Sequence, residues 1–300
     1  MKQFIQFFFV IIISALAITG CNNDIQNSLP QNKARLIVQV TDSPFPIDLI
    51  SNAYITIDTV EIRMKSDSSA TSEKDSFVVI SEGEKNFDLL QLTNGITSEI
   101  AFAELDPGGY DMIRLHVIDA KIVLKDGTEY DLKVPSGSTS GLKIKISPTI
   151  YLSEGQTSDV LLDFDVSRSF VAKGNMVNGH FNGFNFKPVV RCVYLQAAGR
   201  IIGNVTDTTS TPLEKAMVEV LLPASEKSSI LNVTGAENYT EASDSILAST
   251  FTDVNGNYKL IGLPENSYTV ICEMEGYESD TLQNVQVTQG NSTTVNFELK

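Results

Sequence analysis

The sequence predicts an all-β protein that consists of two β-sandwich domains. Short segments alternate apolar with polar residues, and this period of two is typical of half-buried strands. Signals for tight turns separate the segments at intervals typical of sandwiches, and no long helical period occurs after residue 20. The chain has 300 residues, of which 42% are hydrophobic, so it is long enough for two domains with real cores.

Residues 1–20 are predicted to be a lipoprotein signal peptide, and residues 21–33 a polar, flexible tether. Lys2 precedes the apolar run "FIQFFFVIIISALAITG", and no charged residue occurs from Gln3 to Asn23. The apolar run itself is too short for a membrane span of about 20 residues. The motif "ITGC" resembles the lipobox of bacterial lipoproteins, which implies cleavage before Cys21 and diacylation of its side chain. The alternative is an ordinary secretory signal in which the cysteine occurs by chance.

The first domain is predicted to cover residues 34–198. Its hairpin signal is the Asp126-Gly127 turn in "KDGT", because such a dipeptide tolerates the positive φ that a tight turn needs. The stretch 87–105 is ambiguous, with room for one helical turn, and the polar residues 66–76 are expected to form a loop. The first strand pattern starts in the run "ARLIVQVTDSPFP", residues 34–46. The other expected strands are, in order, residues 53–65, 77–81, two within 110–124, 129–134, 141–147, 159–166 and 186–195.

The second domain is predicted to cover residues 199–300. A long, polar and acidic segment, residues 224–245, is expected to be a loop inserted between strands. The seven expected strands are residues 199–207, 216–223, 246–253, 256–263, 267–275, 280–288 and 293–300.

Three pieces of the second domain carry a family resemblance: "GRIIGNVTD" with "TPLEKAMVEV", "TFTDVNGNYKLIGLPENSYTV", and "MEGYES". They resemble the carboxypeptidase regulatory-like domain. The resemblance implies a transthyretin-like, Greek-key sandwich and little about function. Its superfold includes carbohydrate-binding modules, which implies sugar binding as one alternative.

The first domain resembles the bacterial lipoprotein domain catalogued as domain of unknown function 4382. The pieces that carry this resemblance are "LDPGGYDMIRL", "GLKIKI", "LLDFDVSRSF" and "FKPVVRCVY". It implies a secreted, β-rich domain and no chemistry. The two domains in this order behind a lipobox resemble envelope proteins of the Bacteroides group.

Composition argues against several kinds of function. The formal net charge of −15 repels phosphates, so we expect no nucleic-acid partner. Cys192 and Cys272 each lie in an apolar strand-like run and are expected to be buried free thiols. His116 and His180 have no histidine at i+2 or i+4, so the sequence does not predict a histidine-based zinc site. His180 is expected in a loop.

Asp163 and Asp165 lie two residues apart in a predicted strand, so they share one face. Two carboxylates on one face can bind a metal or act as an acid–base pair. We favour a structural interpretation, in which the strand has a solvated face, or the aspartates accept backbone N–H groups at the strand end, or Arg168 pairs with one of them.

The stretch "FTDVNGNYKL" has the oxygen-rich spacing of a calcium loop, with Asp253, Asn255 and Asn257 as candidate ligands. Counted from Asp253, glycine is the fourth residue and Pro264 the twelfth, whereas an EF-hand needs glycine sixth and an acid twelfth. We therefore interpret the stretch as a hairpin turn, with Asp253 accepting backbone N–H groups across it.

The sequence thus predicts a non-enzymatic cell-envelope protein, anchored by lipid at Cys21, that acts as an adhesion or accessory module. No cofactor is expected, and the expected partners are the membrane and a glycan or another envelope protein. The outer membrane is the expected location. Carbohydrate binding is the alternative function, with Tyr239 and Tyr277 as weak candidate ligand-binding residues, and a cryptic hydrolase is a remote one.

Overall fold

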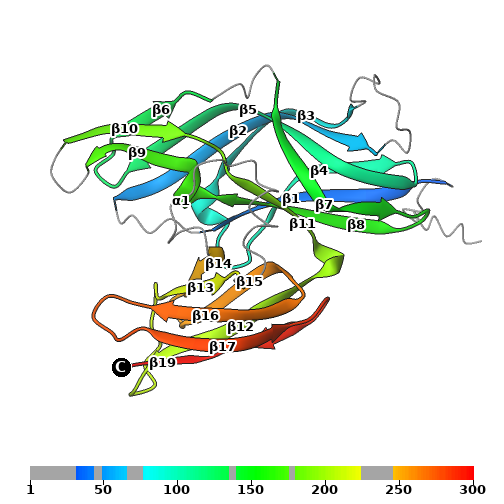
Figure 1. The fold of residues 1–300 in the computed structure, drawn as a ribbon. Coiled ribbons are helices and arrows are strands. Elements are labelled where there is room, and N and C mark those ends of the chain that lie inside the picture. The colour runs from blue at the N-terminus through cyan, green and yellow to red at the C-terminus, as the bar shows by residue number, and fades with distance from the viewer. Residues whose placement is uncertain (1–31, 44–48, 66–76, 135–139, 176–179, 224–245) are drawn as a thin grey trace, which may run out of the picture.

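A computed structural model describes residues 32–43, 49–65, 77–134, 140–175, 180–223 and 246–300. Within them the chain is built almost wholly from strands, and the predicted all-β class is confirmed. Two compact units lie one above the other in Figure 1, the earlier part of the chain above and the later part below. Among the described residues, no helix has the length and apolarity needed to cross a membrane.

The first unit runs up to η2 and contains eleven strand segments among the described residues. Its elements are β1 Ala34–Ser43, β2 Ile50–Met64, β3 Phe77–Asp88, η1 Leu89–Gln91, β4 Ser98–Leu105, β5 Gly108–Leu124, β6 Glu129–Leu132, β7 Leu142–Leu152, β8 Thr157–Asp165, α1 Val166–Ser169, β9 Phe170–Asn175, β10 His180–Phe186, β11 Val190–Tyr194 and η2 Leu195–Ala197.

Two main sheets enclose the core of the first unit. One has the strand order β11-β8-β1-β4, and the other has the order β3-β2-β5-β6, with β7 also pairing with β5. The central strands β1 and β8 run parallel, whereas the other pairs of these sheets are antiparallel. The inward residues of β1 alternate as predicted, with Ala34, Leu36, Val38 and Val40 all buried.

The turn predicted at "KDGT" joins β5 to β6. Leu124 N–H donates to the Thr128 carbonyl over 2.8 Å, and Gly127 has a φ of +85°. The prediction of two strands within residues 110–124 is wrong, because these residues belong to the single strand β5. The ambiguous stretch 87–105 contains the short 3-10 helix η1 followed by β4.

The second unit folds as a sandwich of two sheets. Its strands are β12 Ala198–Asp207, β13 Met217–Leu221, β14 Ile246–Phe251, β15 Asn257–Pro264, β16 Asn266–Glu273, β17 Asp280–Val287, β18 Ser292–Thr294 and β19 Phe297–Leu299. One sheet has the order β15-β12-β18, with β19 also on β12, and the other has the order β14-β13-β16-β17. The last predicted strand is interrupted, so it appears as β18 and β19, both parallel to β12.

Glycine is needed at Gly203, where β12 passes close to the break between β18 and β19. A Cβ atom there would lie 1.6 Å from the Val295 carbonyl oxygen. The Val295 N–H donates to the Ile202 carbonyl over 2.9 Å at the same place. The absence of a side chain therefore lets the chain end pack against β12.

One prediction about the second unit is wrong. The Asn255-Gly256 turn is tight, with Gly256 at a φ of +74°, but β14 and β15 belong to different sheets. The turn is thus a corner between two sheets and not the tip of a hairpin. Gly256 rests on β12, where its carbonyl accepts the Val205 N–H over 2.8 Å.

Candidate functional site

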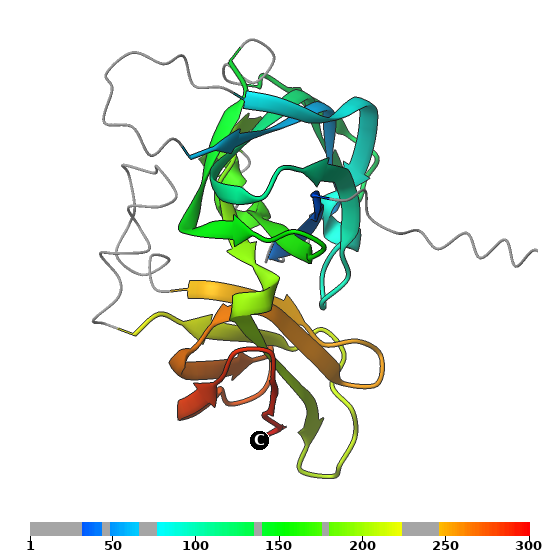
Figure 2. The ribbon, with the colours of Figure 1, turned by 90° about the vertical axis from the view of Figure 1, so that its right-hand side faces the viewer.

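The candidate site is the seam where the two units meet. Figure 2 shows η2 passing from the first unit into the second beside β14. A small apolar cluster, which we call the seam cluster, joins the units there. It consists of the buried residues Leu161, Val193 and Ala198 with the partly buried Leu195 and Ile261.

Strand β8 lies between the first core and the seam, and its sequence "VLLDF" is buried throughout. Val160, Leu162 and Phe164 belong to the core of the first unit, whereas Leu161 belongs to the seam cluster. Asp163 points to the same side as Leu161 and is only 7% exposed. The second unit therefore covers the face that the sequence interpretation left to solvent.

Asn94, in the turn after η1, forms hydrogen bonds from the first unit to the second. Its side-chain oxygen accepts the Lys259 N–H over 2.6 Å, and its side-chain NH2 donates to the Asn257 carbonyl over 3.4 Å. Its backbone N–H donates to the Thr250 hydroxyl over 3.1 Å. Asn94 thus bonds to backbone groups of the edge strand β15 and to a side chain of the edge strand β14, which belong to different sheets.

Arg191, on β11, forms the second polar connection. Its Nη2 donates to Asp163 Oδ2 over 2.6 Å, and its Nη1 donates to the Gly262 carbonyl of the second unit over 3.0 Å. The side chains of Arg191 and Asp163 are 13% and 9% exposed. Burial raises the pKa of Asp163 above its ordinary value, and the positive charge of the neighbouring Arg191 limits this rise.

Asp42, at the end of β1, is a buried acid that lacks such a partner. Its Oδ1 accepts the Val166 N–H over 3.2 Å, whereas its Oδ2 has no hydrogen-bond partner among the described residues. Burial raises the pKa of Asp42 well above its ordinary value of 3.8, and the nearby carboxylates of Asp163 and Asp165 raise it further.

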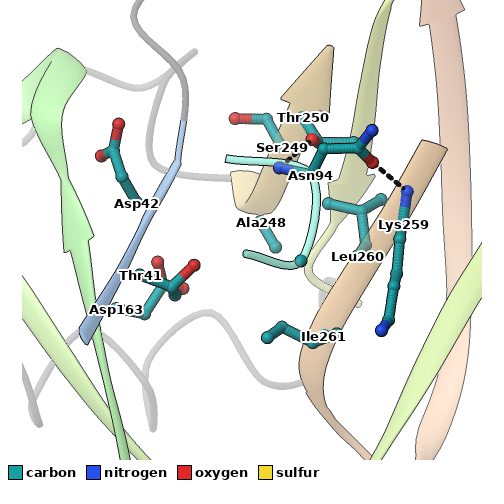
Figure 3. A pocket seen from close by; sticks show the side chains of 11 residues that line it. Thr41, Asp42, Asn94, Asp163, Ala248, Ser249, Thr250, Lys259, Leu260 and Ile261 are labelled. Carbon is teal, nitrogen blue, oxygen red and sulfur yellow. Dashed lines mark hydrogen bonds between the residues drawn. The ribbon is translucent and has the colours of Figure 1, made fainter. Parts of the chain in front are cut away.

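A polar pocket lies where these groups face the second unit (Figure 3). Asp42, Thr41 and Asp163 line one side, and Asn94, Thr250 and Lys259 belong to the other side. Its volume of about 20 Å³ is room for a single water molecule. This polar seam pocket is therefore too small for a substrate.

Asp165 does not form an acid–base pair with Asp163. Its Oδ1 accepts the Arg168 N–H over 2.8 Å and the Ser167 hydroxyl over 2.6 Å, while its Oδ2 pairs with Arg168 Nε over 2.6 Å. This is the N-cap of α1. The predicted pairing with Arg168 is confirmed, as is the acceptance of a backbone N–H at the strand end.

The histidines lie apart from the seam. His116 Nε2 lies 3.1 Å from Glu61 Oε2 on the sheet of β2 and β5, and Arg114 Nη1 contacts the same oxygen over 3.1 Å. His180 was predicted in a loop, which is wrong, because it begins β10 and pairs with Asn175 of β9. Among the described residues, no three His, Cys, Asp or Glu side chains are placed to hold a metal ion.

The candidate calcium ligands hold the corner between β14 and β15. Asp253 Oδ1 accepts the N–H groups of Asn255 and Asn257 over 2.9 and 2.8 Å, as the sequence interpretation expected. Asn257 Oδ1 accepts the side-chain NH2 of Asn204 over 3.1 Å, and that group also donates to the Asn255 carbonyl. The Oδ1 atoms of Asp253 and Asn257 thus accept hydrogen bonds within the fold.

We expect calcium and a chelator to leave the melting temperature of the protein unchanged. Asp253→Ala should lower the free energy of unfolding by roughly 1–2 kcal/mol, because two backbone N–H groups lose their acceptor. Asp253→Asn keeps an acceptor oxygen and is the matched control. A calcium-dependent rise in melting temperature that Asp253→Ala removes would contradict this prediction.

The remaining candidates fall in two groups. Tyr277 is partly buried and packs against the core of the second unit, and Cys192 and Cys272 are buried free thiols, as predicted. Cys21 and Tyr239 lie outside the described residues, so their predicted roles stay predictions.

Comparisons with known proteins fit this architecture. Residues 33–188 match the family described as a domain of unknown function (DUF4382), and residues 200–300 match the carboxypeptidase regulatory-like domain. No curated protein matches the chain.

Similar solved structures show a likeness of fold alone. The 3-chlorocatechol 1,2-dioxygenase of Rhodococcus opacus 1CP is 15% identical over 34% of this chain, which spans 59% of that chain, with a TM-score of 0.23. The minor pilin GBS52 of Streptococcus agalactiae is 10% identical over 89% of this chain and 95% of its own, with a TM-score of 0.23. The major pilin subunit BcpA of Bacillus cereus is 9% identical over 89% of this chain and 70% of its own, with a TM-score of 0.25. At these values none carries an argument about function.

Proposed function

The chain belongs to the DUF4382 family through residues 33–188, and the description of this family assigns no activity. We therefore propose a function from the geometry of the seam. The protein is a non-enzymatic, lipid-anchored module of the cell envelope. Its two sandwich domains are held together at the seam and bind a partner as one unit. Its task is adhesion, or service as an accessory subunit of a surface assembly.

The observation that carries this proposal is that the polar side chains of the seam connect the two units. Asn94 bonds to residues of β14 and β15 in the second unit, and Arg191 joins Asp163 to the Gly262 carbonyl. These groups connect the units, and the polar seam pocket holds no more than a water molecule. A body of this kind suits binding in a fixed geometry better than it suits catalysis.

The anchor is tested by growth of the native host with an alkyne-tagged fatty acid. We expect the wild-type protein to carry the label and to sediment with outer membranes. Cys21→Ser should lose the label and leave the membrane fraction, whereas Cys192→Ser should keep both, since Cys192 is a buried thiol. Labelling that survives Cys21→Ser would contradict the anchor.

The module itself is tested by crosslinking and capture of the anchored chain from native membranes. Recurrent capture of one envelope protein supports the accessory role. A specific hydrolytic turnover that Asp163→Asn abolishes would overturn the non-enzymatic assignment.

Carbohydrate binding is the second candidate, and one residue favours it. Tyr151 is 66% exposed and its ring lies against Gly109, where an added Cβ would come within 3.1 Å of it. An exposed ring of this kind can stack on a sugar. Binding to a glycan array that Tyr151→Ala removes would favour this candidate, and a blank array would eliminate it.

A further inference from the structure

A second pocket at the seam, which we call the apolar seam pocket, is distinct from the polar one. Its walls come from β7, β11 and η2 of the first unit and from the start of β12, β14 and the end of β15 of the second. Val193 and Ala198 belong both to this pocket and to the seam cluster. The pocket therefore continues the apolar contact between the two units outward.

Two polar side chains in the wall of this pocket, Arg191 and Tyr194, are already engaged, and a third, Ser147, is exposed. The charge of Arg191 is paired with Asp163, and its Nη1 donates to Gly262. The Tyr194 hydroxyl lies 3.5 Å from the Ser158 hydroxyl. Burial raises the pKa of the Cys192 thiol to about 12, so this sulfur is neutral at physiological pH.

The size of the apolar seam pocket limits what can enter it. Its volume is about 130 Å³, and an apolar cavity of about 150 Å³ binds a benzene ring. A sugar in such a site would bury hydroxyls without partners, which is costly. A lipid acyl chain is much longer than the pocket. An aromatic ring or a branched aliphatic chain fits both its size and its chemistry.

We propose that the apolar seam pocket binds one apolar side chain, of the size of leucine to phenylalanine, from a protein partner. This inference rests on the proposed binding function and specifies its partner chemistry. Protein interfaces are commonly dominated by a few buried side chains that fill pockets of the other protein. Leu247 and Pro264 from the second unit and Ala197 from the first would contact such an anchor.

The experiment uses the purified protein and three defined probes. These are N-acetyl-leucinamide, N-acetyl-serinamide and fluorobenzene, followed by melting temperature and by the methyl NMR signals of Leu247. Ala197→Leu fills the pocket from the partly exposed η2, and Ala197→Met is the alternative if the leucine variant does not unfold cooperatively. Thr281→Leu, on the exposed face of β17 and away from the pocket, is the matched control.

We expect N-acetyl-leucinamide and fluorobenzene to raise the melting temperature and to shift the Leu247 signals, because a ligand that binds only the folded state stabilises it. The filled variant should bind both at least tenfold more weakly, and the Thr281→Leu variant should bind them like the wild type. N-acetyl-serinamide should have no effect.

Three outcomes would overturn the inference: equal binding by the filled variant, equal binding of the serine probe, or binding of fluorobenzene without the leucine probe. The last would make the pocket a site for a small hydrocarbon. These tests need only the purified chain, so failure of membrane capture would count against the proposed function and leave the result on the pocket standing.

Discussion

Arg191→Ala is expected to lower the free energy of unfolding by about 3–5 kcal/mol, the cost of removing one partner of a buried ion pair. Asp163, which is 7% exposed in the wild type, would lose its guanidinium partner, and the Gly262 carbonyl would lose its donor from the first unit. The loss should shrink as the pH falls, because the unpaired Asp163 can then take up a proton. Chemical denaturation at pH 7 and pH 5 measures both effects.

Two variants separate the ion pair from general damage to the fold. Arg168→Ala removes an arginine from Asp165, but that carboxylate keeps the Ser167 hydroxyl and the backbone N–H of residue 168, so its loss should be smaller. The double variant Arg191→Met with Asp163→Leu should recover much of the stability, since apolar residues often replace buried ion pairs at little cost. A loss in the double variant as large as in Arg191→Ala would refute this account.

The sequence predicted the strands better than it predicted the seam. Alternation locates β1 and β2 because their inward and outward faces differ in polarity. In β8 the same rule misled, because Asp163 resembles a solvent-facing residue until the second unit covers it. Asp163 is covered by residues that lie more than 70 positions later in the chain, such as Ala248 and Ile261. The local sequence pattern does not indicate this contact.

Asn94 illustrates the same limit. It precedes a glycine in an ambiguous stretch, so the sequence indicates only a turn, and its partners Thr250 and Lys259 are 156 and 165 residues distant. The corner at Asp253 is a partial success: its local bonds were predicted, but its assignment to two sheets depends on pairing with β12 and β13. Asp42 is a single acid at a strand end, and its burial could not be inferred locally.

Asp42→Asn is expected to stabilise the protein at neutral pH. Because the pKa of Asp42 is raised in the folded state, the unfolded state releases this proton more readily. The contribution of protonated Asp42 to stability is therefore complete below the pKa of the unfolded state, near 3.8. It is lost as the pH rises through the pKa of the folded state. Within that window the loss is roughly 1.4 kcal/mol for each pH unit.

Asparagine keeps an oxygen for the Val166 N–H and cannot ionise beside Asp163, Asp165 and Asp88, the carboxylates that raise the pKa of Asp42. The variant should gain stability over the wild type between pH 5 and 8, and the difference should vanish near pH 4. Denaturation across this range measures it, and Asp119→Asn, at an exposed position of β5, should show no such trend. A lower stability of Asp42→Asn than of the wild type at pH 7 would contradict this prediction.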